Sequence, residues 1–276
     1  MSIRTDLAVE ATLNRAENLN GVRQSEFEKN GLKVIKTKLP KSAESLIGKK
    51  AGDYVTVYSK ELFSGAESEK YVEVLAELLR DMIKSESGLV LVVGLGNEHI
   101  TPDALGPQVC EKILATRHLS ELTPEICEDL RAVASLATGV LGQTGIESAE
   151  IIKAVCDKIK PSAVIAVDAL AASDVERLLT TVQFSNTGIQ PGAGVLNKRA
   201  ELSQNTLGVP VIALGVPTVV DAYSIKETSG EKRATLMVTP KDIDIKIKRA
   251  AEILALAVNS ALQERLSVEE ISFLNC

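Results

Sequence analysis

Short apolar runs alternate with amphipathic helical patterns along most of this chain of 276 residues. Three runs consist of four or five consecutive aliphatic residues, which is typical of strands buried on both faces of a parallel sheet. These runs are Leu89–Val93, Ala163–Val167 and Val211–Leu214. Elsewhere apolar residues recur at helical spacing and predict helices over residues 68–83, 104–117, 144–159 and 239–265. We therefore expect an α/β fold, with a doubly wound, mostly parallel sheet flanked by helices.

Other segments show different patterns. Leu32–Leu39 and Tyr54–Tyr58 alternate apolar and polar residues, which predicts half-buried strands separated by a turn, and Arg131–Leu136 is a further strand candidate. Residues 1–31 show no clear period. Residues 185–208 are rich in Asn, Gly and Pro and are long for an ordered loop. We expect one domain over residues 1–276, with a small extra β element and a lid or small subdomain at 185–208.

Composition excludes several classes of protein. Aromatic residues make up only 3% of the chain and Trp is absent, which disfavours stacking on nucleic-acid bases. A net charge of −6 lacks the basic footprint that nucleic acids or anionic membranes require. No apolar run approaches the roughly 18 residues of a membrane span. The four cysteines form no Cys-x-x-Cys pair and are typical of a reducing compartment. We expect a cytoplasmic protein that binds neither nucleic acid nor membranes.

The residues that follow the three buried runs carry the candidate chemistry. In a parallel sheet these segments emerge at one edge, which would bring Asp103, Asp168 and Asp221 into one neighbourhood. Two close carboxyl groups do not both ionise easily, so one acts as an acid and the other as a base that activates water. The competing interpretation is that these aspartates cap helices or loops.

The loop Gly94–Asn97 follows the first buried run. Its backbone donors at Gly94, Gly96 and Asn97 could stabilise an oxyanion. The third glycine of a dinucleotide fingerprint is replaced by His99, which argues against that cofactor. The chain has two histidines and no Gly-x-Ser-x-Gly elbow. We expect no cofactor and no metal.

Several blocks, taken together and in order, resemble the germination protease family of spore-forming bacteria. The blocks are Arg4–Ala11, Gly94–Asn97, Thr101–Pro107, Ala166–Ala171, Pro191–Gly194, Asn197–Leu202 and Gly215–Asp221. The resemblance implies a fold similar to hydrogenase maturation proteases and an atypical aspartic endopeptidase with Asp103 and Asp168 as essential aspartates. It also implies degradation of small acid-soluble spore proteins during germination, in the forespore or spore core, by a homotetramer that is made as a zymogen.

The N-terminal block resembles the sites at which this family cuts its substrates. Those sites have the form Thr-Glu-(Phe/Ile)-Ala-Ser-Glu, cut after the first Glu, and this chain carries Thr5-Asp-Leu-Ala-Val-Glu10. We therefore expect self-cleavage between Asp6 and Leu7, with residues 1–6 as propeptide. An acidic residue before the cut should meet a positive charge, for which the candidates are Lys198, Arg199, Arg117 and His118. A metal-dependent maturation-type protease and a non-catalytic ligand-binding module remain alternatives.

Overall fold

The computed structural model describes residues 5–13, 21–63, 68–84, 87–122, 130–195, 199–222 and 236–274. The strands in these residues are β1 (Arg23–Lys29), β2 (Leu32–Leu39), β3 (Gly52–Tyr58), β4 (Val90–Gly94), β5 (Val133–Ala137), β6 (Ala163–Ala172), β7 (Thr181–Ser185), β8 (Val211–Asp221) and β9 (Met237–Val238). The α-helices are α1 (Ala8–Leu13), α2 (Glu44–Ile47), α3 (Val72–Met82), α4 (Leu105–Cys110), α5 (Arg117–Leu122), α6 (Leu141–Thr144), α7 (Ser148–Ile159), α8 (Gln204–Leu207), α9 (Ile243–Leu262) and α10 (Val268–Leu274).

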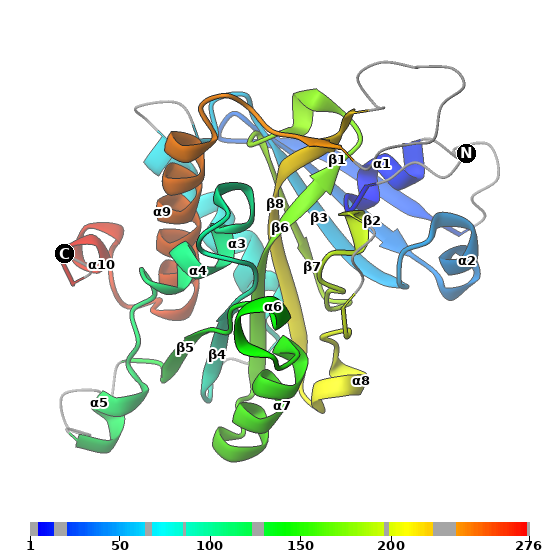
Figure 1. Cartoon of the computed structure of the whole chain (residues 1–276). Helices are drawn as coiled ribbons and strands as arrows, with labels where there is room; N and C mark the ends of the chain where they lie inside the picture. The colour runs from blue at the N-terminus through cyan, green and yellow to red at the C-terminus, as the bar shows by residue number, and fades with distance from the viewer. Residues whose placement is uncertain are drawn as a thin grey trace.

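All nine strands belong to one mixed sheet, in the order β1-β2-β3-β7-β8-β6-β4-β5, with β9 paired to β8 (Figure 1). The strands β8, β6, β4 and β5 are parallel, and the remaining pairings are antiparallel. This arrangement confirms the predicted α/β class with a sheet flanked by helices. The extra β element takes the form of an antiparallel extension of the same sheet.

Helices cover both faces of the sheet. On one face, α3, α4 and α9 bury a continuous aliphatic core against strands of both halves. On the other face, α7 and α8 cover the parallel strands, while α1 and α2 cover the antiparallel strands. The second face is therefore covered by two separate groups of helices, and residues of α2 line the main cavity described below.

Both long central strands extend beyond the apolar runs that predicted them. The runs end at Val167 and Leu214, whereas β6 continues to Ala172 and β8 continues to Asp221. The expectation that Asp168 stands at a strand end is wrong, because it lies in the middle of β6. The residues after it are again small or apolar and pair with β8 in parallel register.

Two predicted helices have different bounds. The helix expected over residues 104–117 ends at Cys110, because the side chain of Asn259 in α9 binds the chain beyond it. Its Nδ2 donates to Lys112 O at 2.9 Å, and its Oδ1 accepts from Leu114 N at 2.9 Å. The segment 144–159 begins with the last residue of α6, and α7 starts only at residue 148. A left-handed turn at Gly145, with φ of 71°, separates the two helices.

Several elements were not predicted, among them the strands β7 and β9 and the short helices α2, α5 and α8. The strand β1 was not predicted because nearly all its residues are exposed, so no apolar period marks it. The helices α1 and α10 were also missed, and α9 starts at residue 243 instead of 239. No helix in the described ranges has the length and apolar character needed to cross a membrane.

The bonds of Asn259 lead to a stability prediction. Asn259 is 1% exposed, and its side chain forms hydrogen bonds with two backbone groups beyond the end of α4, Lys112 O and Leu114 N. Asn259→Ala should lower the free energy of unfolding by about 2 kcal/mol, measured by urea denaturation. Asn205→Ala on the exposed side of α8 is the control and should change it by less than about 0.5 kcal/mol. Equal effects of the two substitutions would contradict this account.

Candidate active site

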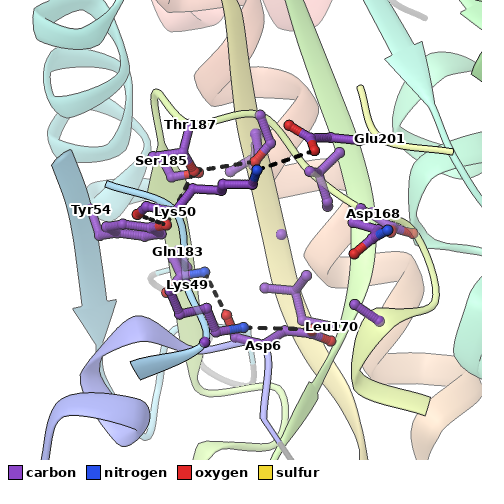
Figure 2. A pocket seen from close by; sticks show the side chains of 18 of the residues that line it. Asp6, Lys49, Lys50, Tyr54, Asp168, Leu170, Gln183, Ser185, Thr187 and Glu201 are labelled. Carbon is purple, nitrogen blue, oxygen red and sulfur yellow. Dashed lines mark hydrogen bonds and ion pairs between the residues drawn. The ribbon is translucent and has the colours of Figure 1, made fainter. Parts of the chain in front are cut away.

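A row of three residues across the sheet forms the floor of the main cavity. Asp168 in β6 pairs with Gly215 in β8, and Gly215 pairs with Gln183 in β7. A Cβ at Gly215 would lie 2.6 Å from Leu170 Cγ, so the glycine between Asp168 and Gln183 makes room for the Leu170 side chain. The resulting cavity has a volume of about 460 Å³. It is walled by α2 and its following turn, by β3 and by the segment 187–193 (Figure 2).

A smaller cavity of about 290 Å³ adjoins the main cavity and contains both predicted aspartates. We call it the aspartate cavity. Asp103 and Asp168 line it together, and Asp6 and Leu170 belong to the walls of both cavities. The structure therefore brings Asp103 and Asp168 to one place, although 64 intervening residues separate them in the sequence.

Asp103 is held by the loop that precedes it. The backbone N–H of Asn97 donates to Asp103 Oδ2 at 2.7 Å. Gly96 has φ of 111°, and a Cβ at this residue would lie 2.0 Å from the backbone oxygen of Asp103. Only glycine allows this close approach between the loop and the aspartate.

A β-bulge in the central sheet supports the same loop. Leu170 pairs with Pro217 and Ala171 pairs with Val219, so Thr218 has no partner in β6. Its hydroxyl group donates to Pro102 O at 2.7 Å. The bulge thus directs a buried side chain of β8 at the residue before Asp103, as bulges near active sites often do.

The two aspartates differ in acidity. Burial raises the pKa of Asp168 well above its ordinary value, and the charges of Asp103 and Asp6 raise it further, against one hydrogen bond from Ala169 N. Burial also raises the pKa of Asp103, but the hydrogen bond from Asn97 N–H opposes that change. Burial and the neighbouring charges thus favour the protonated form of Asp168 more strongly than that of Asp103.

The N-terminal segment occupies the wall between the two cavities. The N–H of Asp6 donates to Ala171 O at 2.8 Å, and its carboxylate Oδ2 accepts from Ala171 N at 2.9 Å. Its carbonyl oxygen accepts from Gln183 Nε2 at 3.1 Å. Its Oδ1 lies 3.8 Å from Lys49 Nζ. Asp6 is thus bound through its backbone and its side chain.

The residues after Asp6 are also anchored. Leu7 is fully buried in an apolar cluster between β2 and β6. The N–H of Ala8 donates to Gln183 Oε1 at 2.7 Å, so one glutamine side chain binds both sides of the Asp6–Leu7 bond. The buried carboxylate of Glu10 accepts from the backbone N–H groups of residues 173 and 174.

Two of the cations predicted to meet an acidic substrate residue lie elsewhere. Arg117 and His118 begin α5, and the preceding Thr116 donates its N–H to Val133 O at the start of β5. The start of β5 lies at the N-terminal ends of the parallel strands, level with Ala163 and five residues before Asp168 in β6. The structure therefore does not bring Arg117 and His118 to the cavities.

The other two predicted cations belong to the long segment 185–208. The guanidinium group of Arg199 is 3.8 Å from Glu147 at the start of α7, and Arg199 lines neither cavity. Lys198 lies outside the described residues. Residues 188–193 of the segment do line the main cavity, but a separate lid or subdomain stays a prediction.

The other candidates have different positions. Asp221 is buried at the end of β8 beside Met237 of β9 and lines neither cavity, so its accessory role stays a prediction. Asn97 uses its N–H for Asp103, which removes that donor from the expected oxyanion site, while the expectation for Gly94 and Gly96 is untested. No three His, Cys, Asp or Glu side chains of the described ranges gather as a metal ion requires.

Lys49, Gln183 and Thr218 were not among the predicted site residues. Gln183 and Thr218 lie in strands whose pairing is set by distant parts of the chain, so no local pattern marks them. Lys49 belongs to the sequence Gly48-Lys-Lys-Ala-Gly-Asp53, which predicts a turn. The two adjacent lysines were the only local signal of a cationic site.

The site thus consists of two carboxyl groups of unequal acidity that face one cavity of a mixed α/β sheet. Comparisons with known proteins give the family. The model of the germination protease family matches residues 3–232. Germination proteases of Clostridium tetani and Caldanaerobacter subterraneus are 42% and 41% identical to the chain. The alignments cover 100% and 99% of the chain, and 100% and 98% of the two relatives.

The germination protease of Bacillus pumilus is 37% identical, over 99% of the chain and 96% of that protein. Among solved structures, the [NiFe] hydrogenase maturation protease HycI of Thermococcus kodakarensis aligns with 66% of the chain and 98% of its own. Its TM-score is 0.39 and its identity 20%. The chain belongs to the germination protease family, and this membership supports a protease function.

The burial of Asp168 predicts how stability depends on pH. The folded protein keeps the Asp168 proton over a pH range in which the unfolded chain has released it, so this group lowers stability as pH rises above about 4. Asp168→Asn should match the wild type near pH 4 and become progressively more stable than it toward neutral pH. Urea denaturation between pH 4 and pH 8 measures the difference.

The exposed Asp157 of α7 supplies the control for this experiment, because Asp157→Asn removes one negative charge without changing a buried group. Its stability should differ little from wild type across the range. A constant difference between Asp168→Asn and wild type at every pH would show that Asp168 is not protonated preferentially in the folded state.

Proposed function

We propose that this protein is an endopeptidase that begins the degradation of small acid-soluble spore proteins during germination, with water activated by Asp103 and Asp168. The observation that carries the proposal is the aspartate cavity, in which the two aspartates lie together beside the chain's own Asp6. Asp6 and Leu7 belong to a sequence that resembles the sites cut by the family. A peptide segment of substrate type therefore lies next to an acid–base pair.

The unequal acidity of the two aspartates assigns their roles. Asp103 is the base and takes a proton from water as its oxygen attacks the peptide carbonyl carbon. Asp168 carries the shared proton and donates it to the carbonyl oxygen, which becomes a hydroxyl group of the tetrahedral intermediate. Collapse of the intermediate breaks the C–N bond. The proton held by Asp103 goes to the leaving amine, and a hydroxyl group of the intermediate returns its proton to Asp168 as the product carboxyl group forms. Both aspartates then return to their starting states.

The contacts of the N-terminal segment support synthesis as a zymogen. While Asp6 is bound between the cavities, its backbone and carboxylate occupy the hydrogen-bonding groups of Ala171 next to Asp168. Removal of residues 1–6 frees this wall of the site. Leu7 and Glu10 keep their contacts, which anchor the new N-terminus. We propose the homotetramer and the forespore or spore core on the family resemblance.

Replacing either aspartate tests the proposed reaction. Asp103→Asn and Asp168→Asn should each reduce cleavage of a purified small acid-soluble spore protein by a factor on the order of 10³, because each removes one of the two proton-transfer groups. Gel electrophoresis of timed digests measures the loss, and circular dichroism checks the fold. Asp157→Asn should cleave at the wild-type rate. Retention of activity in either site variant would refute the pair.

Self-processing gives an independent test. Purified full-length protein incubated at mildly acidic pH, where Asp168 holds its proton, should lose residues 1–6. Mass spectrometry should then find Leu7 as the first residue of the processed chain. The Asp168→Asn protein incubated alone should keep its original mass. A first residue other than Leu7 would show that the proposed cleavage site is wrong.

A further inference from the structure

Lys49 is the cationic side chain that the structure directs at Asp6. Its Nζ lies 3.8 Å from Asp6 Oδ1, and both side chains are largely buried, with 17% and 18% exposed. The neighbouring Lys50 is 64% exposed and reaches Glu201 at 3.6 Å (Figure 2). Of the two lysines in the turn, only Lys49 is in contact with the residue before the proposed cut.

The turn that carries Lys49 is fixed before any substrate binds. Gly48 ends α2 in the left-handed conformation, with φ of 74°, and donates its N–H to Glu44 O at 2.7 Å. The carboxylate of Glu44 accepts from Ala51 N at 2.7 Å. The hydroxyl group of Tyr54 donates to Lys50 O at 2.8 Å. These bonds on both sides of Lys49 hold its backbone, so its ammonium group is preorganised toward the cavity.

The groups around Asp6 bind its backbone N–H, its carbonyl oxygen and its side-chain carboxylate. Ala171 supplies an acceptor for the residue's N–H and a donor for its carboxylate, and Gln183 Nε2 supplies a donor for its carbonyl oxygen. Lys49 supplies the positive charge. None of these groups is within the first six residues, so all remain in the processed chain. A substrate residue that takes the place of Asp6 would meet the same set of partners.

We propose that Lys49, Ala171 and Gln183 form the substrate subsite for an acidic residue on the N-terminal side of the cleaved bond, with Lys49 as the residue that selects its charge. This inference rests on the proposed peptidase function and adds the determinant of its specificity. In a largely buried site a lysine disfavours a neutral or cationic side chain, because its ammonium group then loses the carboxylate that offsets its desolvation. Asp6 holds this subsite in the precursor, and substrate enters it after processing.

Peptide cleavage in trans tests the proposal. The probe is the decapeptide with the sequence of residues 2–11 of this chain, together with a matched peptide that carries Asn in place of Asp6. Processed wild-type protein should prefer the Asp peptide. Lys49→Gln should reduce kcat/KM for the Asp peptide by a factor on the order of 10 to 100 and leave the Asn peptide nearly unchanged. Lys49→Arg should restore most of the preference.

Lys38→Gln is the matched control. Lys38 also has a carboxylate partner, Asp53 at 3.7 Å, but it lines neither the main cavity nor the aspartate cavity. It should keep the wild-type values for both peptides. If Lys49→Gln lowered kcat/KM equally for the Asp and Asn peptides, or for neither, the subsite would be refuted while the peptidase function stood. If wild-type protein cut neither peptide nor a spore protein, the proposed function would fail and the subsite with it.

The peptide assay needs processed protein, and Lys49→Gln would not supply it if this variant did not remove its own residues 1–6. A second experiment therefore exchanges the two charges within the full-length chain. Asp6→Lys and Lys49→Glu should each slow the release of residues 1–6, measured by mass spectrometry. The double variant should release them at least about tenfold faster than either single variant, because it restores opposite charges. Additive losses in the double variant would overturn the proposal.

Discussion

Burial of the Asp168 carboxyl group in the middle of β6 is the constraint on which the site depends. The central strand places the group on the sheet face between two separate sets of helices, where it is 5% exposed. Desolvation and the nearby charge of Asp103 raise its pKa. Gly215 beside it makes room for the Leu170 side chain, and the Thr218 bulge and the Gly96 turn position Asp103. Two carboxyl groups of different acidity thus follow from the deeper burial of Asp168 and from the backbone hydrogen bond to Asp103.

The N-terminal segment contributes a further charge, that of Asp6, beside the two aspartates. Asp6 adds a negative charge that raises the pKa of Asp168 further, and its own carboxylate is balanced by Lys49 and by a backbone N–H. In the proposed precursor the segment is both the occupant of the subsite and the first peptide to be cut. Its departure removes one charge that repels the ionised form of Asp168, so processing should lower the pKa of that group. The same contacts that fill the site in the precursor define the residue that a substrate must supply.

Local sequence patterns predicted the parallel core, because buried strands and helices each have a period that neighbouring residues reveal. The expectation that Asp103 and Asp168 lie close together followed from that core, and both line one cavity. Local patterns did not predict the exposed β1, which shows no apolar face, or the end of α4, which depends on Asn259 about 150 residues away. They placed Asp168 at a strand end because a charged residue interrupts an apolar run. A cationic partner for an acidic substrate residue was expected at Lys198, Arg199, Arg117 or His118, whereas the turn after α2 brings Lys49 to Asp6. Such contacts are decided by strand order and register, which no local pattern encodes.

The protonation of the aspartate pair is the central claim, and it can be observed directly. Carbon-13 labelling of aspartate carboxyl groups, with assignment from the two Asp→Asn variants, allows each group to be titrated by NMR in the folded protein. The account predicts that Asp168 titrates at a higher pH than Asp103 and that Asp103→Asn lowers the pKa of Asp168 by removing the neighbouring charge. An Asp168 signal that titrates like an exposed aspartate, or that does not move in Asp103→Asn, would contradict it.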